Sequence, residues 1–201
     1  MNLTREEARH RSEIIKVERY HVRIDVRGAD ADGATHFTSN TRVRFSTTEP
    51  DTFLDLLDGE IESVIVNGEE VEPEYDGSRI QLHGLHTHRE NLVIVTAKLP
   101  YQHTGQGLHR FVDPADGKVY LYTHFEAADS RRMYSVFEQP DLKAHVDFDV
   151  IAPSDWRVAS NQVHEDIREE EDGLLHDFAL TPRMSTCLLY TSPSPRDGLL
   201  S

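Results

Sequence analysis

Residues 19–27 read Arg19-Tyr20-His21-Val22-Arg23-Ile24-Asp25-Val26-Arg27, with polar and apolar residues in strict alternation. Successive side chains of a β-strand point to opposite faces of a sheet. The alternation therefore predicts a half-buried strand, with Tyr20, Val22, Ile24 and Val26 on the covered face.

Short runs of strand character recur along the rest of the chain. They cover residues 41–45, 53–56, 61–66, 79–82, 92–97, 119–125, 146–150, 156–159 and 174–180. Turn dipeptides separate several of them, and Asn67-Gly68 suits the two-residue loop of a type I′ hairpin. Many short strands without an internal repeat or a long linker predict one all-β domain, an antiparallel sandwich or barrel-like sheet.

A short helix is expected before the first strand. Thr4 can cap its first turn, and Glu7, three residues later, completes a capping box. Ala8, Ile14 and Ile15 provide a modest apolar face. A second short helical segment is expected over residues 128–134.

Composition limits the function classes. The chain has 201 residues and a formal charge of −15, which disfavours binding to nucleic acid. No apolar run is long enough to cross a bilayer, and Met1–Val17 lacks the apolar core of a secretory signal. A single cysteine, Cys187, suits a reducing compartment. These features predict a cytoplasmic protein without a membrane or nucleic-acid partner.

The last fifteen residues differ in composition from the rest of the chain. Residues 187–201 are rich in Ser, Pro and Leu and resemble a translated adaptor or a frameshifted end. The alternative is a disordered Pro-rich tail. We therefore predict a β domain over residues 1–186, followed by a non-native or disordered tail over residues 187–201.

Glu126 is the main candidate site residue. It follows a run of apolar and aromatic residues that ends at Phe125. From the local pattern it is either an ordinary rim glutamate, a partner for Arg131 or Arg132, or a carboxylate held at the end of a strand for a purpose.

No motif for a catalytic metal is found. A zinc peptidase helix needs two histidines four residues apart with a glutamate between them. In the nearest stretch, His164-Glu165-Asp166-Ile167-Arg168, an arginine stands where the second histidine belongs, so we expect a solvated charged loop there. His83, His86 and His88 could form a weak surface metal site, but a polar loop is the simpler interpretation. We predict no metal ligands in this chain.

Several segments, in the right order, resemble the amino-terminal β domain of the aminopeptidase N family of zinc metallo-aminopeptidases. Thr123-His124-Phe125-Glu126 resembles a T-Q-F-E motif that is followed by an arginine, here Arg131 or Arg132, with His124 in place of the usual Gln. Phe137-Glu138-Gln139-Pro140 with Lys143-Ala144 resembles the next segment of that family. The glycine-led stretch 107–113 and Trp156–Asn161 extend the similarity, which covers residues from about 3 to 186.

This resemblance implies a saddle-like β-sandwich that caps the active-site cleft of a cytosolic enzyme. Glu126 would bind the α-amine of a peptide substrate. The zinc cofactor and its ligands would belong to a catalytic domain that is missing from this chain, so the fragment alone is expected to be inactive. The expected partners are a peptide N-terminus and that missing domain. The alternative is a free-standing β-sandwich that binds a protein or peptide without catalysis.

Overall fold

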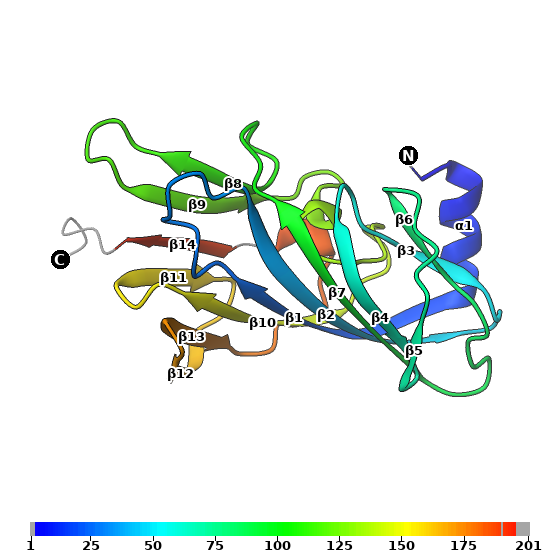
Figure 1. The fold of residues 1–201 in the computed structure, drawn as a ribbon. Coiled ribbons are helices and arrows are strands. Elements are labelled where there is room, and N and C mark those ends of the chain that lie inside the picture. Colours follow the sequence, from blue (N-terminus) through cyan, green and yellow to red (C-terminus); the bar gives the residue numbers. More distant parts are fainter. Residues whose placement is uncertain (1–2, 190, 196–201) are drawn as a thin grey trace.

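The computed structural model describes residues 3–189 and 191–195, and it is built almost entirely of strands (Figure 1). In chain order the elements are α1 (Arg5–Ile14), β1 (Ile15–Asp25), β2 (His36–Thr47), β3 (Thr52–Asp55), β4 (Glu60–Val66), β5 (Glu69–Val71), β6 (Arg79–Leu82), β7 (Asn91–Pro100), β8 (Gly107–Val112), β9 (Val119–His124), the 3-10 helix η1 (Ser130–Arg132), β10 (His145–Ala152), β11 (Trp156–Ser160), β12 (His164–Glu170), β13 (Gly173–Phe178), the 3-10 helix η2 (Thr186–Leu188) and β14 (Thr191–Pro195).

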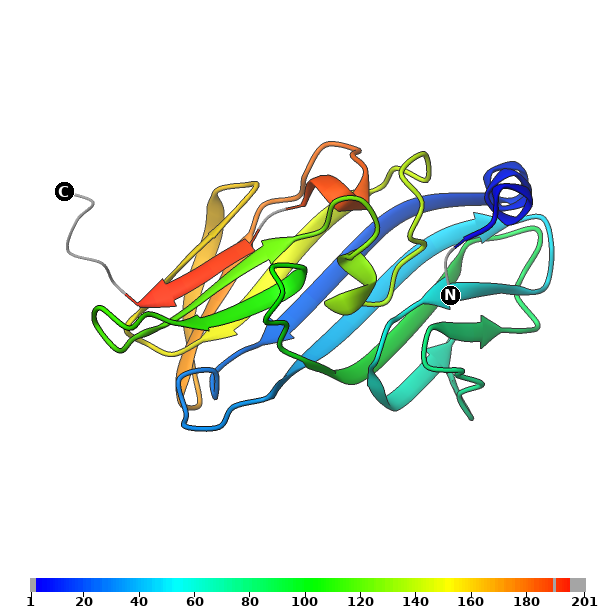
Figure 2. The ribbon, with the colours of Figure 1, turned by 90° about the horizontal axis from the view of Figure 1, so that it is seen from above.

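The strands form one large sheet and three small ones. The large sheet has the order β12-β13-β10-β1-β2-β7-β4-β5, and the pairs β3–β6, β8–β9 and β11–β14 form the small sheets. Figures 1 and 2 show β8, β9 and the segment around η1 lying over one face of the large sheet. This arrangement confirms the predicted all-β fold with packed layers and a short N-terminal helix.

The large sheet is mixed rather than purely antiparallel. β1 pairs with β10 in parallel, with His21 opposite Asp147 and Arg23 opposite Asp149. Local turn signals reveal antiparallel hairpins, whereas a parallel pair needs a long crossover connection. Here the partner strands lie more than a hundred residues apart in the chain, so the parallel pairing has no local sequence signal.

Every predicted strand is present, but four strands were not predicted, β5, β8, β12 and, in the tail segment, β14. β5 and β8 lack a clean alternation of polar and apolar residues. The third, β12, contains the stretch His164–Arg168 that was expected to be a charged loop; this expectation was wrong. All seven residues of β12 are exposed, and the strand is an edge of the large sheet. Without a buried face it has no apolar period, and charged side chains are common on edge strands.

The core lies between the large sheet and the layer that covers it. Tyr134, which follows η1, is fully buried and makes edge contacts with three aromatic rings, those of Tyr20 in β1, Phe148 in β10 and Phe125 just after β9. Edge-to-face contacts of this kind add to the free energy of area burial. They fix the end of β9 against the large sheet.

Two predicted local motifs are confirmed. Asn67 and Gly68 connect β4 to β5 with φ values of 54° and 95°, as a type I′ turn requires. At the start of α1 the Thr4 hydroxyl accepts a hydrogen bond from the Glu7 amide at 3.2 Å, and the Glu7 carboxylate accepts one from the Thr4 amide at 2.8 Å.

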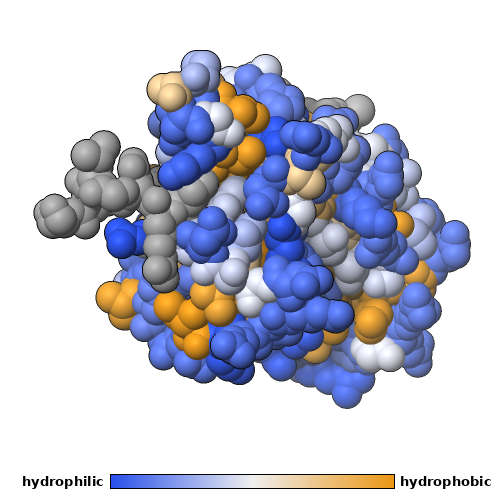
Figure 3. Space-filling model, turned by 60° about the vertical axis from the view of Figure 1, so that its left-hand side comes forward, coloured by the Kyte–Doolittle hydropathy of each residue, from blue (hydrophilic) through white to orange (hydrophobic). Residues whose placement is uncertain are grey.

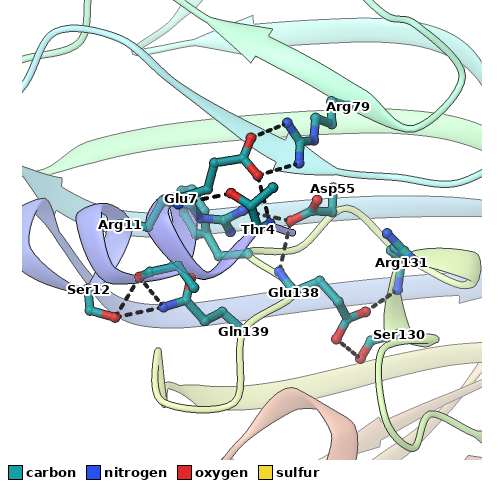
Figure 4. A network of polar contacts seen from close by, with 12 residues as sticks. Thr4, Glu7, Arg11, Ser12, Asp55, Arg79, Ser130, Arg131, Glu138 and Gln139 are labelled. Atoms are coloured by element: carbon teal, nitrogen blue, oxygen red, sulfur yellow. Dashed lines mark hydrogen bonds and ion pairs between the residues drawn. The ribbon is translucent and has the colours of Figure 1, made fainter. Parts of the chain in front are cut away.

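α1 is held to the domain by a buried charge as well as by the predicted apolar residues Ile14 and Ile15, which pack in the core. Arg11 is 2% exposed, and its Nη1 donates to Oδ2 of the buried Asp55 in β3 at 3.0 Å (Figure 4). The Arg11 guanidinium also lies over the rings of Phe53, at 4.5 Å, and Phe137, at 5.3 Å. Aromatic faces attract a desolvated guanidinium, so the helix is fixed by both kinds of contact.

A second arginine completes this contact region. Arg79 in β6 lies over the same Phe53 ring at 4.2 Å, and its Nη1 donates to the Glu7 carboxylate at 2.6 Å. The hydrogen bond from Arg79, together with the one from the Thr4 amide, lowers the pKa of Glu7 to about 2. The capping residue of α1 is therefore also an anchor to the β3–β6 sheet.

The substitution Asp55→Asn should destabilise the protein by about 3 to 5 kcal/mol, because it leaves the Arg11 charge buried without a counter-charge. Urea unfolding at neutral pH measures the change. The control is Glu49→Gln, which removes the exposed His10–Glu49 pair and should cost less than about 1 kcal/mol. Equal effects of the two substitutions would show that the buried pair does not hold α1.

Candidate functional site

Glu126 lies two residues beyond the end of β9, with its side chain exposed. The residue before it, Phe125, is 2% exposed and packs against Tyr134. On the other side, the amide of Asp129 donates to the Phe125 carbonyl at 3.1 Å and closes a turn. The peptide bond between Glu126 and Ala127 is cis. An exposed carboxylate is thus presented from a backbone segment that is fixed on both sides.

Glu138, from the Phe-Glu-Gln-Pro segment, holds the next turn of the chain. Its Oε1 accepts a hydrogen bond from the Ser130 hydroxyl at 3.0 Å, and its Oε2 accepts one from the Arg131 amide at 2.8 Å (Figure 4). Its own amide donates to Asp55 Oδ2 at 3.0 Å. Glu138 therefore connects η1 to the buried ion pair under α1.

Burial is the main influence on the Glu138 carboxyl, which is 7% exposed and has its pKa raised to about 7. The hydrogen bonds from the Arg131 amide and the Ser130 hydroxyl oppose this rise, because they favour the charged form. The Glu138 carboxyl therefore keeps its proton to a higher pH than an exposed glutamate does.

Arg132, one of the two arginines that could match the family motif, is held by a local ion pair. Arg132 Nε donates to Asp129 Oδ1 at 2.8 Å, which ties η1 to the turn before it. Gly107, the first residue of β8, approaches this arginine closely. A Cβ atom at Gly107 would lie 2.7 Å from the Cβ atom of Arg132, and the φ of Gly107 is +58°. The contact explains why a glycine begins this stretch.

Cys187 in η2 lies in the same neighbourhood. Its pKa is raised first by burial, and then by the negative charges of Glu138 and Glu126. A raised pKa keeps a thiol protonated and unreactive at neutral pH. The structure therefore gives no support for a nucleophilic role of this cysteine.

The tail contributes one strand to this end of the molecule. β14 pairs with β11 in antiparallel register and lies beside β9. The predicted boundary at residue 186, and the non-native or disordered character of residues 187–201, stay predictions. Residues 190 and 196–201 lie outside the described residues.

The histidines singled out from the sequence do not converge. His83 Nδ1 lies 3.0 Å from an Asp51 carboxylate oxygen, whereas His86 Nε2 accepts from Arg89 at 2.6 Å. Within residues 3–189, no group of three or more His, Cys, Asp or Glu side chains is placed to hold a metal ion. The side chains described here therefore do not fit a zinc ion.

Two further histidine pairs form without a signal in the sequence. His103 and His109 lie with ring centroids 6.3 Å apart, and His109 stacks on Tyr122. His164 Nε2 lies 3.3 Å from Nδ1 of His176 on the neighbouring strand. Burial lowers the pKa of His176 to about 4, so this pair is neutral at physiological pH.

The ion pairs between β1 and β10 were also not predicted from the sequence. Arg19 and His21 contact Asp147, and Arg23 contacts Asp149. The hydrogen bonds that His21 donates to the carboxylates of Asp147 and Asp149 raise its pKa to about 9, so it is protonated at neutral pH. The sequence contained a signal for these pairs, because every second residue is basic in part of β1 and every second residue is acidic in part of β10. Only the parallel pairing brings the two strands together.

Glu138→Gln should change how stability depends on pH. The folded protein keeps the Glu138 proton up to about pH 7, whereas an unfolded glutamate, with a pKa of 4.5, releases it. Unfolding thus releases a proton between these values, so the contribution of Glu138 is full below pH 4.5 and is lost as pH rises towards 7. Glutamine does not titrate. From pH 5 to pH 8 the variant should gain about 2 to 3 kcal/mol relative to the wild type.

Urea unfolding at several pH values tests this expectation. Glu165→Gln, at an exposed position in β12, is the matched control. Its free energy of unfolding should depend on pH in the same way as that of the wild type. A constant difference between Glu138→Gln and wild type across the whole pH range would contradict the raised pKa.

No helix among the described residues has both the length and the apolar character needed to span a lipid bilayer.

Comparisons with known proteins find similarity over most of the chain. Residues 19–188 match the family described as the peptidase M1 N-terminal domain. The chain is 42% identical over 189 residues to aminopeptidase N of Streptomyces lividans, an alignment that covers 92% of this chain and 21% of that protein. It is 30% identical over 180 residues to probable aminopeptidase 1 of Saccharolobus solfataricus, which covers 87% of this chain and 21% of that protein.

The chain spans about a fifth of the length of these relatives. The family match nevertheless covers most of the chain, from the middle of β1 to η2, and so includes the segment that presents Glu126. The chain therefore belongs to the peptidase M1 N-terminal domain family.

Proposed function

We propose that this chain is the amino-terminal β domain of a cytoplasmic zinc metallo-aminopeptidase that removes N-terminal amino acids from peptides. The domain caps the active-site cleft of the parent enzyme, and Glu126 binds the α-amine of the substrate. Relatives that are named aminopeptidases support the hydrolase class. The low cysteine content supports a reducing compartment.

The observation that carries the proposal is the exposed carboxylate of Glu126 on a fixed turn. Phe125 anchors the backbone before it in the aromatic core, and the η1 turn after it is held by Glu138. A rim glutamate with no role needs no such support. A binding carboxylate gains from it, because a site held in place loses less entropy when a ligand binds.

A carboxylate suits the recognition of a peptide N-terminus. The α-ammonium group of a peptide is a triple hydrogen-bond donor with a positive charge, and an internal peptide bond has neither property. A charge-assisted hydrogen bond to Glu126 would therefore select chain ends and set the substrate's register. The bond would be strongest once a covering domain excludes water from the site.

Zinc would supply Lewis-acid chemistry at the substrate carbonyl in the parent enzyme. Because the described side chains do not fit a zinc ion, its ligands would lie in a part of the parent that is not in this chain. The role proposed for this domain is binding and orientation of the substrate, and the domain alone would have no peptidase activity.

Exposed apolar side chains give the missing domain a place to dock. Phe111, Val112 and Tyr122 of the β8–β9 hairpin are 45%, 47% and 40% exposed, and Leu188 of η2 is 63% exposed. Figure 3 shows separate apolar patches on a surface that is otherwise mostly hydrophilic. Exposed patches of this kind mark interaction sites, and Phe111, Val112, Tyr122 and Leu188 lie on elements that flank Glu126.

Glu126→Ala in the full-length parent should lower kcat/KM for an unblocked peptide by roughly 100-fold, the scale expected for loss of a desolvated charge-assisted contact. Glu126→Gln keeps an acceptor without the charge and should fall between alanine and wild type. The exposed residue Glu165 in β12 is the control, and Glu165→Ala should leave kcat/KM unchanged. A Glu126→Ala enzyme with wild-type kcat/KM would refute the amine-binding role.

Sequencing the source DNA across and beyond codon 186 tests the connection to a larger enzyme. We expect the true reading frame to continue into a catalytic domain with a G-x-M-E-N segment and an H-E-x-x-H helix. A stop codon directly after the β domain would favour the free-standing binding module. A natural read through the exact sequence of residues 187–201 would show that the tail is genuine.

A further inference from the structure

The outer face of the large sheet carries like charges directly opposite one another. In the antiparallel pair β1–β2, Arg19 lies opposite Arg44 and His21 lies opposite Arg42. Like charges in directly opposed positions destabilise a sheet, and opposite charges stabilise it. This two-by-two block of cationic side chains is unexpected in a chain with a formal charge of −15.

A β-bulge creates this arrangement. The register places Val17 opposite Phe45 and then Arg19 opposite Arg44, so Glu18 is the extra residue. In a regular ladder Glu18 would lie opposite Arg44 and form a favourable cross-strand pair. Instead Glu18 accepts from Arg183 at 3.1 Å. Bulges are known to redirect side chains next to functional sites. Here the bulge places the Arg19 guanidinium opposite Arg44, at the position where a regular ladder would place the Glu18 carboxylate.

The neighbouring carboxylates neutralise only part of this charge. On β10, the other neighbour of β1, two carboxylates pair with three cations. Asp147 and Asp149 form ion pairs with Arg19, His21 and Arg23. On β2, Arg44 pairs with Glu90 at 2.8 Å.

Arg42 is the exception in this block. It is exposed and has no ion-pair partner within residues 3–189. The block therefore keeps a positive potential that its own side chains do not cancel.

A hollow of about 270 Å³ lies on this cationic block. It is lined by Arg19, His21, Arg42, Arg44, Leu92 and Ile94. Leu92 and Ile94 come from β7, the next strand of the sheet, where they lie opposite Arg44 and Arg42. The hollow thus has two cationic strands on one side and an aliphatic strand on the other, and none of its lining residues is acidic.

We propose that this hollow is a binding site for a small organic anion, a carboxylate or phosphate attached to a short apolar group. The anionic end would lie between Arg42, Arg44 and His21, and the apolar end would lie on Leu92 and Ile94. The site is separate from Glu126, and the inference does not depend on the proposed peptidase function.

The chemistry of the lining selects this ligand class. Guanidinium groups present paired donors that match carboxylate and phosphate oxygens. An aliphatic floor favours ligands that bury apolar surface as well as charge. The small volume favours ligands below drug size, and the high negative charge of the whole chain disfavours long polyanions such as nucleic acid.

Titration of the ¹⁵N-labelled chain with hexanoate, followed by amide chemical shifts, tests the site. We expect saturable shifts in β1, β2 and β7. Hexanamide, which has the same chain without the charge, should give no saturable shift. Inorganic phosphate, which lacks the apolar group, should bind more weakly than hexanoate.

Arg42→Gln should weaken hexanoate binding roughly 10-fold, the effect of losing about one charge-assisted contact. The matched control is Lys98→Gln, which removes the same charge from the same face of β7, where Lys98 pairs with Glu62 outside the hollow. It should leave the affinity unchanged. Both positions are exposed, and the amide spectrum of each variant verifies its fold.

Three results would overturn the proposal. The first is the absence of saturable shifts with hexanoate. The second is equal weakening by Arg42→Gln and Lys98→Gln, which would indicate a general charge effect. The third is binding of hexanamide or inorganic phosphate as tight as that of hexanoate, which would contradict the combination of charge and apolar surface.

Discussion

Asp55 is the residue on which the supports of the candidate site converge. Its Oδ2 atom accepts from Arg11 of α1 and from the amide of Glu138, at 3.0 Å in both cases. Glu138 in turn accepts from Ser130 and Arg131 and holds η1. A buried charge is tolerated only when it is paired and hydrogen-bonded, so these groups depend on one another. The chain of contacts leads from the N-terminal helix to the turn that follows Glu126.

The large sheet uses its two faces differently. The inner face packs aromatic and aliphatic side chains against the layer formed by β8, β9 and the segment around η1 (Figure 2). The outer face carries rows of charged residues from β1, β2 and β10. Both faces are formed by the same strands, because successive side chains of a strand point to opposite sides of the sheet. The proposed peptide-binding site and the proposed anion-binding site can therefore lie on opposite sides of one domain without sharing a residue.

Much of the fold could be predicted because its signals are local. The alternation in residues 19–27, the Asn67-Gly68 turn and the Thr4–Glu7 capping box each act within a few residues, and each has the predicted structure. Glu126 could be singled out because its motif is continuous in sequence. β12 could not be predicted in this way. All its residues are exposed, so its sequence needs no alternation of apolar and polar residues.

The sequence by itself determined the all-β class, the family, the N-terminal helix and the position of Glu126 at the end of a strand, because strand period, capping and motif order are properties of neighbouring residues. Only the tertiary structure decided that Arg11 is buried on Asp55, that Glu138 holds η1, and that β1 pairs in parallel with β10. It also decided the register shift at Glu18, which brings Arg19 opposite Arg44. These features join residues far apart in the chain, and the burial and pairing that select them exist only after the layers have packed.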